Sequence, residues 1–338
     1  MAAQLGLTRR QWLGATLLIP LCSARVASAH SAASHDSRTM MGTRVDITVQ
    51  HRDAALRENA VRAAWAEMGR LVGNLSRYEP DSVVAMLQRQ AGRTPVRITP
   101  DVMNVLSEAR SLSRISGSAF DITVGAYAGW RFDAEHAAMP TPADLAQART
   151  LVDHRDVVLD TRHGTAFLRR PHMRLDLGGI AKLPILEAGM AVLRLHGVQD
   201  AQIDGGGDVI TSGQWQGRDW RVGIRDAHAP DRLAGVVTLR DGVVASSGDY
   251  ERCFERGGQR YHHILDTRTG MPTQGPNGVV LVAREGAAVN GRGAALMAAN
   301  PAQRAAILGD LQSRADVLVF ERDRTRWHTA GMTRWLNA

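Results

Sequence analysis

Strand-like and helix-like segments follow one another in this chain without a regular strand–helix–strand alternation, which limits the folds it can adopt. Residues 44–50 alternate apolar and polar side chains, as a strand with one buried face does. Between about 55 and 77 the apolar residues recur at helical spacing. A doubly wound parallel sheet needs strands and helices in turn. We therefore expect one α+β domain with a mixed, mainly antiparallel sheet and packed helices.

The later segments favour the same fold class. Helices are predicted over 101–115, 185–197, 291–299 and 301–312. Strands are predicted near 199–204, 219–225, 236–246, 262–266 and 278–284, and hairpins over 156–170 and 315–329. The chain contains no repeat, no low-complexity tract and no linker rich in Pro or Gly that would divide it.

The first 29 residues have the order of an export signal. Paired arginines at 9 and 10 precede an apolar run over 12–21, and Ala27-Ser28-Ala29 forms a cleavage site. The run is too short to span a bilayer, and the arginines are typical of a twin-arginine signal. We expect loss of 1–29, a flexible stretch over 30–39, a domain over 40–338 and a periplasmic location.

The chain has two cysteines. Cys22 lies in the leader, but Leu21 stands before it where lipoprotein signals carry a small residue, so we do not expect a lipid anchor. Cys253 is then alone, and one cysteine cannot form an internal disulfide. The fold must therefore depend on its hydrophobic core, even in an oxidising compartment.

The formal charge of +7 falls to +4 when the three arginines of the leader are removed. The basic residues are scattered, which indicates a mild attraction for anions and argues against a nucleic-acid-binding stripe. Lys182 is the only lysine among 41 basic residues. A site that needs a compact ammonium would keep a lysine, because a guanidinium is a planar fork of different reach. The alternative is a surface lysine kept by chance.

Common motifs for nucleotides, zinc and hydrolysis are absent from the sequence. No G-x-G-x-x-G follows a strand, and there is no P-loop, no C-x-x-C and no H-E-x-x-H. No G-x-S-x-G elbow supports a Ser-His-Asp triad, although spacing alone leaves such a triad open.

Short polar segments, all but one of which contain glycine, remain as the candidate functional elements. Glycine lets the backbone approach a ligand closely and presents bare N–H groups to phosphate oxygens. The segments are MGT (41–43), LSRYEPDS (75–82), SGSAFDITVG (116–125), RLDLGGIAK (174–182), IDGGGDVITSG (203–213), SSGDYER (246–252) and YHHILDTRTGMP (261–272).

In order and spacing these segments resemble the FAD:protein FMN transferases, the ApbE-like flavin transferase family. The blocks AFD-TVG, LDLGGIAK, SSGDY and HHILD-TG-P carry the resemblance, which runs from Met41 to about Gly309. The resemblance implies a periplasmic enzyme that takes FAD and a divalent metal, usually Mg²⁺. Such an enzyme transfers the FMN half of FAD to a threonine of a membrane-associated redox protein and releases AMP.

The resemblance also implies roles for individual residues. Met41 and Tyr78 would line the flavin or adenine pocket, and Ala119, Phe120 and Asp121 would form a second wall. Asp176 and Ser247 would contact the cofactor, Ile264 its rings and Lys182 its phosphates. His263 would accept the threonine proton, and Gly179 would offer its carbonyl to the metal. Without the resemblance, Tyr78 and Phe120 could be core aromatics, and His262 and His263 ordinary strand residues.

One segment, AVNGRGAAL (288–296), departs from the family pattern A-D-A-x-x-T-A-L, whose Asp and Thr bind the metal. Asn290 keeps a neutral oxygen at the Asp position, and Ala294 keeps none at the Thr position. Arg292 between them could place a positive charge near the vacated position. Leu183-Pro184 also replaces the usual Gly-Tyr. Mg²⁺ prefers oxygen ligands that include a carboxylate, so these changes put metal binding in question.

Two functions therefore stay open. One is an active flavin transferase, and the other is a FAD-binding, transfer-deficient carrier or scaffold of the same fold. A periplasmic binding protein unrelated to the family is a more remote third alternative.

Overall fold

The computed structural model describes residues 32–133 and 135–337. The expected leader, with its paired arginines and Cys22, lies outside these residues. Within them, an eight-stranded sheet runs in the order β1-β2-β6-β7-β10-β13-β14-β15, and each neighbouring pair is antiparallel. Its strands are β1 (Ala33–Met40), β2 (Thr43–Gln50), β6 (Asp200–Asp204), β7 (Val209–Ser212), β10 (Gly242–Gly248), β13 (Gly278–Ala283), β14 (Ala315–Phe320) and β15 (Arg326–His328).

Three smaller antiparallel sheets accompany the large one in the described residues. The first joins β16 (Leu336–Asn337), β9 (Ala229–Leu239) and β8 (Trp220–Asp226), the second joins β3 (Val96–Arg97), β5 (Thr165–Leu168) and β4 (Val157–Asp160), and the third is the hairpin of β11 (Cys253–Arg256) and β12 (Gln259–His262).

Helices begin where the sequence supplies a cap. The side chains of Asp53, Thr99 and Asn300 each accept a backbone N–H at the start of a helix, and a proline follows the last two. The α-helices are α1 (Ala54–Leu75), α2 (Val83–Arg89), α3 (Pro100–Ile115), α4 (Pro142–Arg149), α5 (Lys182–Leu195), α6 (Arg292–Ala298) and α7 (Pro301–Leu311). The 3₁₀ turns are η1 (Ile122–Ala126), η2 (His154–Asp156), η3 (Gly286–Ala288) and η4 (Ala330–Arg334).

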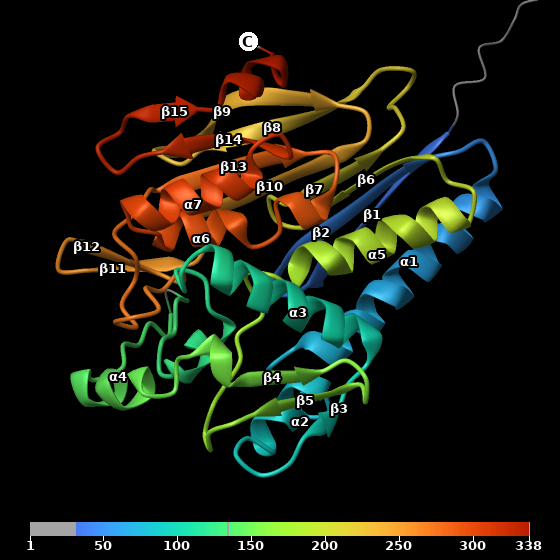
Figure 1. Ribbon diagram of the computed structural model, residues 1–338. Coiled ribbons are helices and arrows are strands. Elements are labelled where there is room, and N and C mark those ends of the chain that lie inside the picture. Colours follow the sequence, from blue (N-terminus) through green and yellow to red (C-terminus); the bar gives the residue numbers. More distant parts are fainter. Residues whose placement is uncertain (1–31, 134, 338) are drawn as a thin grey trace, which may run out of the picture. The chain divides into compact units, whose positions relative to one another are not determined.

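The middle of the large sheet is buried on both faces, and β13 shows this most clearly. Val279 and Leu281 pack into the core that the helices form, whereas Val280 and Val282 pack into a second core beneath β8 and β9. Successive strand residues point to opposite faces, so a continuous apolar run is what a strand between two layers requires. Figure 1 shows α1 and α5 side by side on the helical face and β8 and β9 on the other.

The predicted fold class is confirmed: the domain is α+β, with antiparallel sheets and packed helices. One prediction near its start is wrong. Residues 33–40 form strand β1 and pair with β2 along their whole length, whereas we expected 30–39 to be flexible. The polar sequence ASHDSRTM has a weak strand pattern, and pairing with the apolar strand β2 supplies its order.

Two strand predictions also need correction. The expected strand over 236–246 is two strands, because β9 ends at Leu239 and β10 begins at Gly242. The expected strand over 262–266 ends at His262, and the residues after it form a loop with one isolated bridge at Leu265. This early end of β12 places His263 in the loop. Among the described helices, none is long and apolar enough to cross a membrane.

Candidate functional site

A cavity of about 1300 Å³ is walled by segments that lie between residues 41 and 298. Small-molecule sites are commonly about 300 to 1,000 Å³, so this cavity has room for a dinucleotide. All of the predicted site residues line it: Met41, Tyr78, Ala119, Phe120, Asp121, Asp176, Gly179, Lys182, Ser247, His263, Ile264, Asn290 and Ala294.

Lys182 is the first residue of α5, and its side chain lines the cavity. No side chain caps this helix, so its first N–H groups remain free of a capping partner. A cation at the positive end of a helix is unfavourable by itself. Lys182 is paired there with Asp208, with 3.0 Å between Nζ and Oδ2, and the other oxygen of Asp208 accepts the N–H of Ser246 at 3.1 Å. The arrangement favours an anionic ligand at this end of the cavity.

Asp176 is held by a turn and by an arginine that the sequence analysis did not select. Its Oδ1 accepts the N–H of Gly178 at 2.8 Å, and its Oδ2 lies 3.0 Å from Nη1 of Arg77. Arg77 also donates to the hydroxyl of Tyr78 at 2.8 Å. Tyr78 is 71% exposed and therefore lies at the surface, not in the core. The segment LSRYEPDS thus contributes a charged residue beside its aromatic one.

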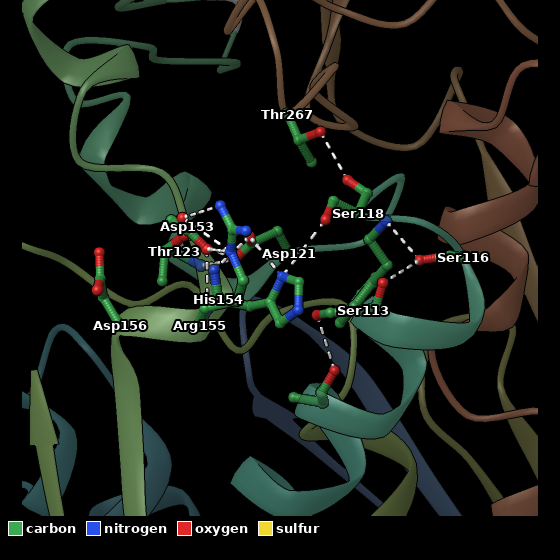
Figure 2. A network of polar contacts seen from close by, with 12 residues as sticks. Ser113, Ser116, Ser118, Asp121, Thr123, Asp153, His154, Arg155, Asp156 and Thr267 are labelled. Carbon is green, nitrogen blue, oxygen red and sulfur yellow. Dashed lines mark hydrogen bonds and ion pairs between the residues drawn. The ribbon is translucent and has the colours of Figure 1, made fainter.

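Asp121 holds the wall of the cavity in shape. Its Oδ1 accepts both the N–H and the hydroxyl of Thr123, at 2.8 and 2.6 Å, and its Oδ2 accepts the N–H of His154 at 2.8 Å (Figure 2). The carboxylate is only 2% exposed. These bonds occupy both oxygens, so Asp121 positions the neighbouring Phe120 and Ala119. A direct bond from Asp121 to a cofactor, as the resemblance implied, has little room.

The loop that carries His263 is fastened to the same wall. The hydroxyl of Thr267 donates to the carbonyl of Ser118 at 2.7 Å (Figure 2). The hydroxyl of Tyr127 donates to the carbonyl of Thr267 at 2.9 Å, and Nε1 of Trp130 donates to the carbonyl of Gly270 at 2.9 Å. Three bonds therefore join residues 118–130 to residues 267–270, although these segments are far apart in the sequence.

The two adjacent histidines have different surroundings. His262 is 2% exposed, and its Nε2 donates to the carbonyl of Thr273 at 3.1 Å. His263 lines the cavity, and its Nδ1 has no hydrogen-bond partner within the described residues. Burial, together with the charge of Arg252, lowers the pKa of His263 to about 4. The imidazole is therefore neutral at pH 7 and can accept a proton.

The donors at the expected metal position do not fit Mg²⁺. The amide nitrogen of Asn290 donates to Oε2 of Glu108 and to the carbonyl of Ile180, each at 3.0 Å. Ala294 has only a methyl group to offer. Within the described residues, no group of three or more His, Cys, Asp or Glu side chains could hold a metal ion. A magnesium site usually includes a carboxylate, and neither of these two positions supplies one.

Arg292 does not place its charge in the cavity, which corrects the expectation from the sequence. Its guanidinium pairs with Asp310 at 2.8 Å and donates to the carbonyl oxygens of Ala287 and Asn290. The side chain is 7% exposed and is absent from the cavity wall. These bonds fix the turn before α6, so the role of Arg292 is structural.

Sequence reasoning missed several charged residues of the wall: Arg77, Asp208, Glu251 and Arg252. Each lies inside a polar segment that the sequence analysis names, LSRYEPDS, IDGGGDVITSG or SSGDYER, of which the last two contain glycine. The signal that could have found them is a charged residue within a segment already suspected of facing a ligand.

Comparison with known proteins supports the fold and the relationship. The model of the ApbE family matches residues 41–319. The FAD:protein FMN transferase of Treponema pallidum is 34% identical over 285 residues, 77% of each chain, and that of Klebsiella pneumoniae is 32% identical over 238 residues, 70% of this chain and 72% of the relative.

Solved structures agree with the fold. The ApbE protein of Thermotoga maritima superposes with a TM-score of 0.82 at 24% identity, covering 91% of this chain and all of that one. The flavin transferase ApbE of Vibrio cholerae gives a TM-score of 0.77 at 21% identity, covering 90% of this chain and all of that one. On the family model and the identity to these transferases, the chain belongs to the ApbE family.

Proposed function

We propose that this chain is a FAD:protein FMN transferase that moves FMN from FAD to a threonine hydroxyl of an acceptor protein. The observation that carries the proposal is the convergence of the separately predicted residues on one cavity. Two relatives named FAD:protein FMN transferase, 34% and 32% identical to this chain, support it.

The reaction is a transfer at phosphorus. The threonine oxygen forms a bond to the phosphorus of the FMN half, and the bond from that phosphorus to the bridging oxygen breaks. AMP leaves with the electron pair of the broken bond. His263 takes the threonine proton, which its neutral imidazole permits at pH 7. Catalysis of this kind depends mainly on position and on opposite charge.

The wall residues divide these tasks. Lys182 and the uncapped start of α5 face the diphosphate, while Asp208 holds the ammonium in place. Asp176 and Arg77, as a pair, orient the cofactor. Met41, Tyr78, Phe120 and Ile264 supply the surface against which the planar rings lie.

The proposal extends to the location of the enzyme and to its acceptor protein. We place the enzyme in the periplasm, exported by the twin-arginine-type signal over 1–29, with an acceptor domain of a membrane-associated redox protein as its partner. Replacing Arg9 and Arg10 by lysine should leave the protein in the cytoplasm, which fractionation and immunoblotting would measure. Export at the normal level would contradict this location.

The function itself is tested by incubating the purified protein with FAD and a threonine-bearing acceptor domain. We expect AMP release and an acceptor heavier by one FMN in the mass spectrum. His263→Asn should bind FAD, measured by flavin fluorescence, yet transfer little of it. Binding of FAD by the unsubstituted protein without any AMP release would favour the transfer-deficient carrier instead.

A further inference from the structure

The metal position lacks the charge that the family pattern would supply. Residues 290 and 294 are Asn and Ala, and both amide hydrogens of Asn290 have acceptors in the protein, Glu108 and the carbonyl of Ile180. The cavity-lining oxygens of this position, those of the Asn290 amide and the Gly179 backbone, are neutral, and the carboxylate of Glu108 behind Asn290 does not line the cavity. The diphosphate of FAD is anionic, and more charge develops on the phosphoryl oxygens during transfer. Another source of positive charge is therefore needed.

Two cations of the wall are already partly neutralised. Lys182 is paired with Asp208 and Arg77 with Asp176, each at 3.0 Å. Their fields are reduced by the partner carboxylates. They can hold the diphosphate, but neither supplies an unpaired positive charge at the phosphorus atom that is transferred.

Arg252 differs from both. It lines the cavity, its side chain is exposed, and within the described residues it forms no ion pair or side-chain hydrogen bond. Its backbone carbonyl accepts the N–H of His263 at 3.1 Å, so the two residues are neighbours at the base of the β11–β12 hairpin. The guanidinium is also close enough to His263 to lower the pKa of the imidazole.

We infer that this enzyme binds and transfers flavin without a divalent cation, and that the guanidinium of Arg252 supplies the missing positive charge at the diphosphate. The inference rests on the proposed function. A guanidinium suits the task because its planar set of donors can bind two phosphoryl oxygens at once. The proton still goes to His263 and the electron pair to AMP. No covalent bond to Arg252 forms or breaks.

The chain offers a matched control. Arg174 also lines the cavity, is exposed and forms no ion pair or side-chain hydrogen bond within the described residues. No hydrogen bond joins its backbone to His263. Arg174→Gln removes the same charge from the same cavity. It therefore shows how much FAD binding weakens when any positive charge of the wall is lost, and a larger effect of Arg252→Gln is specific to the position beside His263.

The experiment titrates the purified protein with FAD and with riboflavin, which has no phosphate, in EDTA and in Mg²⁺. AMP release is measured in the same buffers after addition of FAD and the threonine-bearing acceptor domain. We expect the same FAD affinity in both buffers within about twofold. Arg252→Gln should weaken FAD binding and slow AMP release at least tenfold, leave riboflavin binding unchanged and be partly rescued by Arg252→Lys. Arg174→Gln should change FAD binding less than threefold. Asn290→Asp combined with Ala294→Thr should create a thermal stabilisation by Mg²⁺ alone.

Three results would overturn the inference, and they differ from one another. Tenfold tighter FAD binding in Mg²⁺ than in EDTA would show that the unsubstituted site uses a cation. Equal FAD binding and AMP release by Arg252→Gln and the unsubstituted protein would remove Arg252 from the site. No FAD binding by the unsubstituted protein in either buffer would reject the proposed function and the inference together.

Discussion

The only lysine of the chain, Lys182, is paired at 3.0 Å with Asp208, a carboxylate that faces the same cavity. Removing the lysine alone leaves an unpaired negative charge where an anionic diphosphate should bind. Truncating one partner of such a pair commonly costs about 2 to 5 kcal/mol. We expect Lys182→Ala to weaken FAD binding by about 100-fold, as measured by fluorescence titration.

The double variant Lys182→Ala with Asp208→Asn should bind FAD about tenfold more tightly than Lys182→Ala does, because the repelling charge is gone. If the double variant binds no better than the single one, Asp208 acts only through the position of Lys182.

Asp121 and Asp323 share two bonds to a threonine but differ in burial, and Asp121 alone accepts a third, from the N–H of His154. Each Oδ1 accepts the N–H and the hydroxyl of the threonine two residues later, but Asp121 is buried and Asp323 is exposed. Asp121→Ala should lower the free energy of unfolding by about 2 to 4 kcal/mol, because buried donors lose their acceptor. Asp323→Ala should lower it much less. Equal losses in urea denaturation would refute this account.

Gly125 allows two backbone segments to touch beside the cavity. A Cβ at this position would lie 2.5 Å from the carbonyl carbon of Leu175 and 2.8 Å from the nitrogen of Asp176. Backbone atoms cannot move aside as a flexible side chain can, so Gly125→Ala should cost about 1 to 3 kcal/mol of stability. It should also weaken FAD binding, because Asp176 is displaced.

Gly69 is the control for that substitution. It lies on the exposed side of α1, and a Cβ there would meet nothing within 4 Å. Gly69→Ala should leave FAD binding unchanged and raise the free energy of unfolding by up to about 1 kcal/mol, because alanine favours a helix. If Gly125→Ala matched it in both measurements, the close approach to Leu175 would not matter.

The titration of His263 should make the free energy of unfolding depend on pH. Burial lowers the pKa of His263 to about 4 in the folded protein, and an unfolded histidine titrates near 6.5. Between these pH values the unfolded chain binds a proton that the folded chain does not. Stability should therefore fall as the pH falls from about 6.5 to 4, by up to about 3 kcal/mol.

His263→Gln should flatten that decline only in part, because burial also lowers the pKa of His262. Urea denaturation at a series of pH values measures both proteins. If the free energy of unfolding fell equally with pH for His263→Gln and the unsubstituted protein, the pKa of His263 would not be lowered by folding.

The predictable part of the fold was the part with strong periodicity. Helices α1, α3 and α7 combine apolar spacing with caps, and their predicted ranges agree with the structure within a few residues. The edge strand β1 could not be read from ASHDSRTM, since its order comes from pairing with β2. The break between β9 and β10 falls at Arg240-Asp241, where a single glycine after the turn gave a weak signal.

The cavity could be predicted better than its internal contacts. Every predicted polar segment contributes to the wall, and all but LSRYEPDS contain glycine, which marks places where the backbone comes close to a neighbour. Residues 85–93 and 127–132 also line the cavity, but they belong to none of the predicted segments. The ion pair of Lys182 with Asp208 joins α5 to the segment before β7, and no spacing rule connects them. The orientation of Arg292 could not be predicted from AVNGRGAAL either, because its partner Asp310 lies on another helix, α7.

The cavity wall draws on the β1–β2 turn, on α2, on the start of α5, on α6, on the end of β10 and on loops spread between residues 77 and 291. Because these elements are spread along most of the chain, the complete pocket requires the whole domain to be folded. A bound dinucleotide should consequently raise the melting temperature of the entire unit in one cooperative step.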